Sequence, residues 1–244
     1  MAFTRGANVV TDGLVLCLDA ANPKSYISGS TSWRDMAGSG YLGTLINNPS
    51  SSSDNCGSIV FNGTTNYVNS PSYPVTSPLS FYTGSFTLEA TVKPTAYQTS
   101  SFFGLTNMII VKGPSATFNY AMQLNSDTSV SFIKRGTTES LQYSTFTVPS
   151  MINKINNLVV TINPIGTIAT CYINGNLIAS ASITGTPIEP HPTNDTLRIA
   201  GIGPGSTTPT QFIGNIYNAK IYNRTLTAEQ VQQNYNALKS RFNL

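Results

Sequence analysis

Residues 85–94, SFTLEATVKP, contain the pattern that decides the fold class. Their apolar side chains stand at alternate positions: Phe86, Leu88, Ala90 and Val92. A period of two residues is typical of a β-strand with one face toward a core, because successive side chains point to opposite faces. The only carboxylate of the stretch, Glu89, falls on the polar side, so it belongs either to a catalytic site or to the outer face of a sheet.

The same short alternating pattern recurs along the chain and predicts about a dozen strands. The other runs cover residues 13–20, 57–63, 66–70, 107–113, 120–126, 129–135, 157–164, 168–175, 176–183, 196–202 and 212–223. They are rich in β-branched and aromatic residues, and turn residues separate them. This arrangement predicts an all-β fold, an antiparallel jelly-roll β-sandwich.

Two kinds of connection link these runs. Asn174 and Gly175 lie between two alternating runs and predict a two-residue type I′ hairpin turn, because both residue types tolerate positive φ. Residues 47–55, NNPSSSSDN, and residues 201–211, GIGPGSTTPTQ, are rich in Ser, Gly and Pro. We expect both segments to be exposed loops between strands.

The C-terminal residues change to a helical period. Thr227 can cap a helix, and Gln230 completes the capping box. Leu226 can then pack against Val231. One apolar stripe follows at helical spacing: Val231, Tyr235, Leu238 and Phe242. We expect a C-terminal α-helix over residues 227–242 that covers a sheet edge, with contact to a neighbouring subunit as the alternative.

Composition narrows the classes of function. The 244 residues suit one domain over residues 1–244 with a short N-terminal arm over residues 1–10. Charged residues make up 9%, and no basic run exceeds Lys134–Arg135, so we expect no nucleic-acid partner. No stretch approaches the ~20 apolar residues of a membrane helix, and residues 1–10 lack a signal-peptide pattern. We expect a chain that is made in the cytoplasm and has no membrane partner.

The cysteines do not suggest a nucleophile or a metal site. Cys17 and Cys171 stand in apolar strand patterns, which favours buried reduced thiols, and Cys56 lies in a polar segment. A nucleophilic thiol needs a basic partner, and the only histidine, His191, lies between two prolines. No CxxC or HxxxH spacing is present.

Four segments carry a family resemblance: residues 13–26 with 32–49, residues 57–68, residues 85–94, and residues 212–242. In this order and spacing they resemble the laminin G-like, concanavalin A-like jelly-roll family over nearly the whole chain. The first and last segments look most like versions found in structural proteins of tailed bacteriophages. The resemblance implies a virion component.

The family includes glycoside hydrolases, which bears on Glu89. A retaining enzyme needs two carboxyl groups about 5 Å apart, and glucanases of this fold carry them at alternate positions of one strand. The alternate positions around Glu89 hold no acid: Ser85, Thr87, Thr91 and Lys93. We therefore expect no enzyme activity and no catalytic residue. Glu89 is then a polar residue on the outer side of its strand, hydrogen-bonded at most to a loop.

Related domains often bind calcium in rim loops, and the matching positions here are poor in acids. Calcium takes six to eight oxygen ligands, usually including several carboxylates. Asn66, Tyr217 and Asn218 stand where relatives often have acids. We expect no cofactor; a weak calcium site using Asp35, Asn62 or Asn66 is the alternative, and turn-stabilising hydrogen bonds of Asp and Asn are the structural reading.

The residues around the single tryptophan are candidates for binding a sugar. A sugar platform needs an exposed ring beside hydrogen-bonding groups, and this segment offers four such residues: Trp33, Arg34, Asp35 and Tyr41. The resemblance implies the alternative, in which Trp33 packs on the sandwich and Asp35 fixes a glycine-rich turn. Loop tyrosines 73, 82 and 97 are further candidates.

Two functions follow as hypotheses. The first is a non-enzymatic phage structural protein, a capsid decoration or cement protein or a neck or tail accessory, located in the virion. Its partners would be the major capsid protein or neck and tail proteins, together with further copies of itself. The residues expected to contact them are Phe3, Arg5, Tyr73, Phe81, Tyr82 and His191. The alternative is a carbohydrate-binding module or host-recognition adhesin that binds surface glycans.

Overall fold

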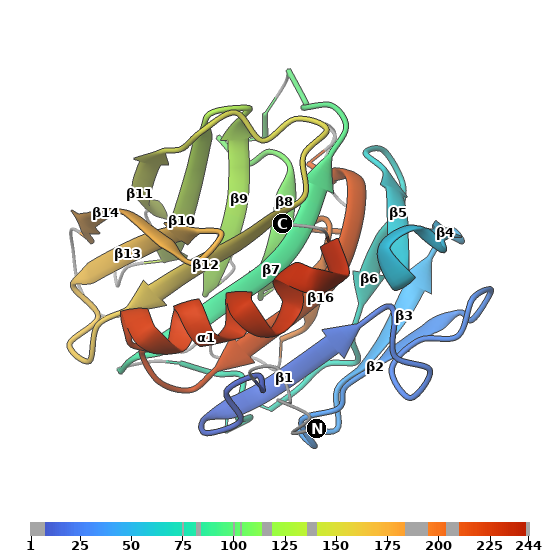
Figure 1. Ribbon diagram of the computed structural model, residues 1–244, viewed down its shortest axis with the longest axis horizontal. Helices are drawn as coiled ribbons and strands as arrows, with labels where there is room; N and C mark the ends of the chain where they lie inside the picture. The colour runs from blue at the N-terminus through green and yellow to red at the C-terminus, as the bar shows by residue number, and fades with distance from the viewer. Residues whose placement is uncertain are drawn as a thin grey trace, which may run out of the picture.

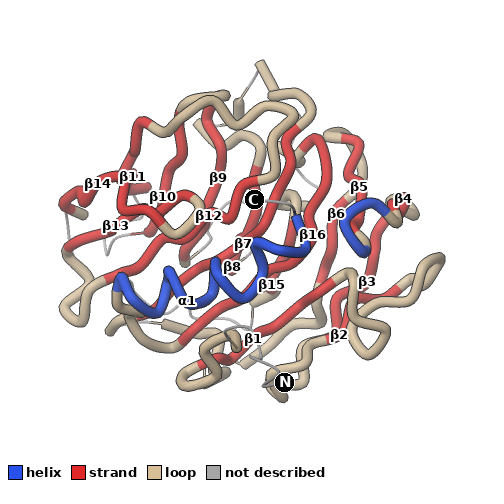
Figure 2. Tube along the Cα trace, viewed as in Figure 1, coloured by secondary structure: helices blue, strands red, loops and turns tan. Residues whose placement is uncertain are grey.

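The computed structural model is a sandwich of two antiparallel eight-stranded sheets with one α-helix on its outside (Figure 1). The structure describes residues 8–74, 76–81, 84–99, 101–102, 104–113, 119–135, 141–183, 195–203 and 210–242. Each sheet combines hairpins of consecutive strands with strands far apart in the sequence, and strands dominate the trace (Figure 2).

The first sheet runs in the order β14 (Asn176–Ser182), β13 (Ile168–Ile173), β12 (Asn156–Ile162), β7 (Phe86–Pro94), β16 (Ile213–Tyr222), β5 (Ser58–Asn62) and β4 (Ser50–Ser52), with β1 (Leu14–Asp19) also paired to β16. The second sheet runs in the order β11 (Leu141–Thr147), β10 (Ser129–Arg135), β9 (Tyr120–Ser126), β8 (Met108–Lys112), β15 (Leu197–Ile199), β6 (Tyr67–Asn69), β3 (Leu42–Ile46) and β2 (Ser32–Arg34). The predicted antiparallel sandwich is confirmed.

The main core lies between the two sheets. The alternate apolar residues of β7 enter it, as predicted: Phe86, Leu88, Ala90 and Val92. The ring of Phe86 stacks on Phe81, with centroids 4.7 Å apart, and lies 5.8 Å from the ring of Phe132 in the opposite sheet. These contacts bury the inner faces of both sheets.

The strand prediction was right where the alternating pattern is strong and missed the less regular strands. Asn174 and Gly175 have φ of 52° and 78°, and they connect β13 to β14 as the predicted hairpin turn. The strands β2, β3, β4 and β11 were not predicted. In particular, residues 47–55 are not simply a loop, because β4 pairs with β5 through backbone hydrogen bonds that a run of serines can make as well as any other sequence.

Helix α1 (Ala228–Leu238) begins at the predicted capping box. The Thr227 hydroxyl accepts a hydrogen bond from the backbone N–H of Gln230, and the Gln230 side chain accepts one from the N–H of Thr227. The predicted end at Phe242 is wrong in detail, because the last turn is the 3₁₀ helix η2 (Lys239–Phe242). No helix among the described residues is long and apolar enough to cross a membrane.

The helix covers a face of the first sheet, so the prediction that it covers an edge is wrong. Figure 1 shows α1 lying across β7 and β16. Val231 packs with Val159, Tyr172 and Tyr222 on the outer face of the sheet. These apolar side chains point away from the main core, and the helix removes them from water. Of the predicted apolar stripe, Val231 and Phe242 are buried, whereas Tyr235 and Leu238 are only partly buried. The helix also buries one polar residue, Asn234, completely.

The helix also holds the start of the described chain. The N–H of Val10 donates to Asn234 Oδ1 (2.8 Å), and the Gln233 side chain donates to the carbonyl of Asn8 (2.7 Å). Val10, the last residue of the predicted N-terminal arm, is buried beside the helix. Residues 1–7 lie outside the described part of the chain.

Candidate functional site

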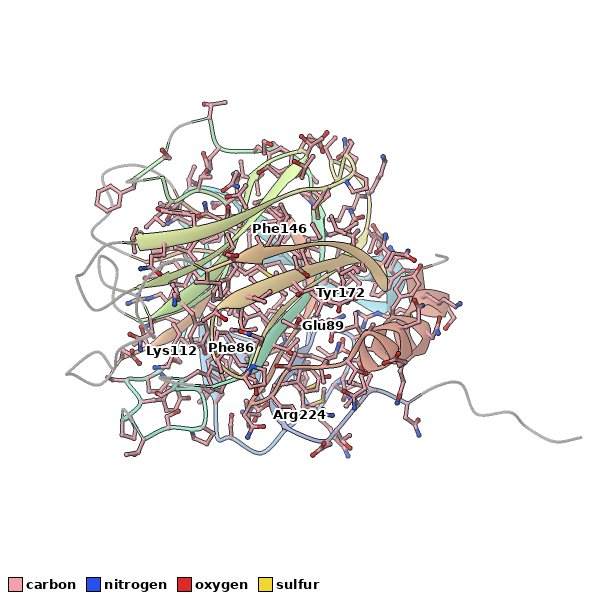
Figure 3. All side chains as sticks on the ribbon, turned by 90° about the vertical axis from the view of Figure 1, so that its left-hand side faces the viewer. Phe86, Glu89, Lys112, Phe146, Tyr172 and Arg224 are labelled. Carbon is pink, nitrogen blue, oxygen red and sulfur yellow. The ribbon has the colours of Figure 1, made fainter. Side chains whose placement is uncertain are left out.

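Glu89 is buried, and this corrects the view that it stands on an open polar face. Its side chain, labelled in Figure 3, is 0% exposed and lies between the first sheet and helix α1. Lys220, its direct partner in the register of β16 with β7, donates from Nζ to Glu89 Oε1 over 2.8 Å. The carboxylate is therefore paired with a cation and is not free for catalysis.

Amides complete the coordination of the Glu89 carboxylate. Asn157 of β12 donates to Oε1 (3.0 Å), and Asn234 of α1 donates to Oε2 (2.7 Å). Asn234 also donates to the hydroxyl of Tyr222 (2.9 Å), whose pKa is raised by burial and by the charge of Glu89. Charge-assisted hydrogen bonds of this kind are the strong ones in proteins, so the network fixes the helix on the sheet.

The three cysteines are free thiols in different surroundings. Cys171 is buried, and burial raises the pKa of its thiol to about 12. Burial also raises the pKa of Cys17 to about 11, although the nearby Lys220 opposes the shift. Cys56 is exposed at the end of the 3₁₀ helix η1 (Asp54–Cys56). Cys171 is thus buried as expected, Cys17 is only partly buried, and Cys56 is the accessible thiol.

The positions considered for calcium are engaged in hydrogen bonds within the chain. Asn62 Oδ1 accepts from the backbone N–H groups of residues 64, 65 and 66, and Asn66 Oδ1 accepts from the N–H of Asn62. Asp35 accepts from the N–H groups of Cys17, Ala37 and Ser39. Among the described residues, no group of three or more His, Cys, Asp or Glu side chains is placed to hold a metal.

The predicted sugar platform is wrong for its two aromatic residues, and the alternative that the resemblance implied, in which Trp33 packs on the sandwich, is confirmed. Trp33 of β2 is 0% exposed and Tyr41, just before β3, is 2% exposed, and both side chains pack in the main core. Asp35 organises the glycine-containing turn that follows β2, as the resemblance implied. Of the four predicted residues, Arg34 keeps an exposed side chain.

The predicted partner-contact residues are only partly described. Phe81 is a correction, because it is 8% exposed and stacks on Phe86 inside the core. Tyr73 is half-buried against Tyr41, and its hydroxyl accepts from the N–H of Leu42. The other predicted contacts lie outside the described residues: Phe3, Arg5, Tyr82 and His191.

Two hollows flank the β1–β2 connection, residues 20–31. We call the first the basic hollow; it has a volume of about 310 Å³ and is lined by Pro23, Lys24, Ser25, Ile27, Ser30, Ser32 and Arg34. The head groups of Lys24 and Arg34 make no hydrogen bond or ion pair with any described residue. Ile27 adds an apolar side chain that is 66% exposed. This combination suits a ligand with polar or anionic groups.

The second hollow, which we call the neutral hollow, lies toward β4 and η1. It has a volume of about 350 Å³, and its polar lining includes Tyr26, Ser28, Ser51, Ser53, Cys56 and Ser58. No charged side chain of the described residues lines it. Sequence reasoning missed this site because its two walls, residues 20–28 and 51–58, are brought together only by the sandwich. The run of serines was the only local signal.

A model of the Concanavalin A-like lectin/glucanases superfamily matches residues 62–232. The chain belongs to this superfamily. No curated protein matches the chain. The family membership agrees with the predicted resemblance and with the two-sheet architecture.

Solved structures similar to this lectin-type domain come from toxins. The binding domain of Paraclostridial Mosquitocidal Protein 1 has a TM-score of 0.66 at 16% identity, covering 93% of this chain and 52% of that one. The Botulinum Neurotoxin Type G receptor binding domain has a TM-score of 0.64 at 18% identity, covering 92% and 51%. The binding domain of Botulinum Neurotoxin DC in complex with SialylT has a TM-score of 0.62 at 16% identity, covering 93% and 52%.

These structural similarities establish a shared fold. The chain spans about half the length of the toxin domains, so it corresponds to a part of each. The protein is therefore a concanavalin A-like, lectin-type domain that resembles the receptor-binding domains of toxins in its fold.

Proposed function

We propose that the chain is a non-enzymatic binding domain that attaches to glycans or glycosylated receptors through the surface around the β1–β2 connection. One observation carries the proposal: the two hollows there offer hydroxyl groups and two cations that pair with no described residue, and no carboxylate is among their described lining residues. Such a surface can bind a polar ligand but lacks the acid pair that glycoside hydrolysis requires. Fold membership and the toxin binding domains support the same class of function, as analogy.

The proposal that the domain is not an enzyme also rests on Glu89. A general acid or nucleophile must reach the substrate, and Glu89 is covered by α1 and bonded to Lys220 and two amides. By comparison with the family's glucanases, Glu89 is the first candidate for a catalytic carboxylate. Its position makes it part of the scaffold.

The phage structural role is the competing proposal. The matched family and the toxin structures support the lectin-type part of the sequence prediction and give no support to its phage part. The predicted virion location, virion partners and self-association therefore stay predictions. Quantitative mass spectrometry of purified particles tests them, because a cement protein is present in many copies and an adhesin in few.

A glycan microarray probed with the whole chain tests the proposed function. We expect binding to a restricted set of glycans, and no release of reducing sugar from those same glycans. Arg34→Ala should weaken binding, whereas Lys154→Ala should not, because Lys154 is an exposed cation that lines a different hollow. Absence of glycan binding, or release of reducing sugar, would contradict the proposal.

A further inference from the structure

We infer that the neutral hollow is a binding site for a single uncharged sugar ring, an inference that rests on the proposed function and assigns its ligand class and site. Its volume of about 350 Å³ falls at the low end of the ~300–1,000 Å³ typical of small-molecule sites. Its polar lining is made almost entirely of hydroxyl groups. A polyhydroxylated, uncharged ligand is the natural complement to such a lining.

Tyr26 is the residue that points to a ligand. Its side chain lines the hollow and is 6% exposed, so the ring is held by the protein. Its hydroxyl makes no hydrogen bond with any described residue. The hydroxyl is not among the fully buried side-chain atoms that lack a partner, so it opens into the hollow, where a sugar hydroxyl can bond to it in place of water.

Further unpaired polar groups lie around Tyr26. The Ser53 hydroxyl makes no capping hydrogen bond to η1, and no bond to another described residue is present. Ser28 and Ser51 share one hydrogen bond of 2.9 Å across the hollow, which joins its two walls. Strand β4 ends the first sheet, so its outer backbone edge has no described strand beside it. These groups can donate and accept at several points around a sugar ring.

The wall formed by residues 53–58 is held rigidly from behind. Arg241 donates to the carbonyls of Asn55 (2.8 Å) and Gly57 (2.7 Å) and to Asp19 Oδ1 (2.7 Å). Gly57 has a φ of 130°, and a Cβ there would lie 2.8 Å from the carbonyl oxygen of Ala20. Binding therefore requires little reordering of this wall, which favours affinity for a small ligand.

The comparison with the basic hollow argues for a neutral sugar. Lys24 and Arg34 line the basic hollow and would attract a carboxylate or sulfate there. No cation is among the described residues that line the neutral hollow, so an anionic sugar would lose hydration there without compensation. Neutral and anionic rings should thus be discriminated at this site.

Cys56 provides a direct reporter because its thiol lines the hollow. Modification of the native whole chain by 5,5′-dithiobis(2-nitrobenzoic acid) at about pH 8 should show one fast thiol, since Cys17 and Cys171 are less exposed and have a raised pKa. Cys56→Ser should remove this fast phase. The probes are glucose, galactose, mannose and N-acetylglucosamine, each up to about 50 mM, with glucuronic acid as the anionic probe.

We expect at least one neutral sugar to slow the Cys56 reaction about threefold or more in a saturable way, and glucuronic acid to have less effect. Tyr26→Phe should raise the half-protecting concentration about three- to tenfold, because one hydrogen bond is lost. Tyr235→Phe, on the helix, is the matched control and should leave protection unchanged.

The inference is overturned if no neutral sugar protects Cys56, if glucuronic acid protects it better, or if Tyr26→Phe leaves protection unchanged. These results can be separated from failure of the proposed function. Array binding that persists in Tyr26→Phe, with no protection of Cys56, leaves the glycan-binding function standing and places it on another surface. A chain that binds nothing on the array contradicts the proposed function itself.

Discussion

The polar groups under helix α1 and those of the neutral hollow contrast in how they are satisfied. Glu89, Lys220 and Asn234 are fully or almost fully buried and bond to one another or to their neighbours on β12 and α1. Tyr26 is nearly as buried, yet its hydroxyl bonds to no described residue. Both regions carry polar residues at low exposure, but the charges of the first are paired within the protein, whereas the Tyr26 hydroxyl faces a hollow.

The contrast separates structural polar residues from candidates for binding. A buried polar group that is fully paired contributes to the position of the elements that carry it, and its removal harms folding. A low-exposure group without a partner contributes little to folding, and its removal should harm only binding. Substitutions at the two regions should therefore differ in their effect on the free energy of unfolding.

Glu89→Gln should cause the largest loss of stability. The substitution leaves Lys220 buried without a counter-charge, and breaking a buried ion pair in this way costs about 3–5 kcal/mol. This exceeds the small cost expected for a residue on an open outer face. Urea unfolding followed by circular dichroism measures it.

The double variant Glu89→Gln/Lys220→Met is the control for this explanation. It removes both charges, so it should be more stable than Glu89→Gln alone. If the single variant loses less than about 1 kcal/mol, the pair does not hold the helix as described.

Asn234→Ala should have the second largest effect, about 1–3 kcal/mol. It removes the donor to Glu89 Oε2 and the acceptor of the Val10 N–H, which leaves two buried groups unpaired. Hydrogen exchange at Val10 should become faster, because its N–H loses its bond to the helix. Unchanged hydrogen exchange at Val10 would show that the helix does not hold the N-terminal segment.

Tyr26→Phe should change the free energy of unfolding by less than about 0.5 kcal/mol, because no bond to a described residue is lost. Tyr222→Phe is the matched comparison in the buried network. Its hydroxyl accepts from Asn234, so we expect a loss of about 1–3 kcal/mol. Equal effects of the two substitutions in thermal and urea unfolding would break the contrast between the regions.

Removal of divalent cations should have the smallest effect. The oxygens of Asp35, Asn62 and Asn66 already accept backbone hydrogen bonds, so a chelator should leave the melting temperature unchanged. A bound ion present at 100 times its dissociation constant would add about 2.7 kcal/mol. A clear decrease with chelator that calcium reverses would show that these turns bind a metal.

Sequence patterns of short range predicted much of the fold. The alternation in residues 85–94, the Asn174–Gly175 turn and the Thr227–Gln230 capping box each depend on residues within one turn or strand, so each can be read locally. The short strand β4 escaped prediction, because a serine run has little strand propensity and pairs through its backbone.

The candidate site was predicted less well for a physical reason. Trp33 and Arg34 are adjacent in sequence, but strand geometry sends one side chain into the core and leaves the other exposed. Sequence composition suggests an aromatic platform there, but burying a large aromatic ring stabilises the folded state more than leaving the ring exposed. Register and packing therefore decided which member of the predicted set can meet a ligand.

The sequence by itself determined the β-sandwich, its hairpin and its capped helix, because the hydrophobic period and the turn chemistry act between near neighbours. Only the tertiary structure decided that Glu89 would meet Lys220, 131 residues away, and that Tyr26 would face a run of serines across a hollow. Pairing of a charge or a hydroxyl depends on which distant strand or loop arrives beside it. The same carboxylate or tyrosine is thus structural or available for binding according to the partner that folding supplies.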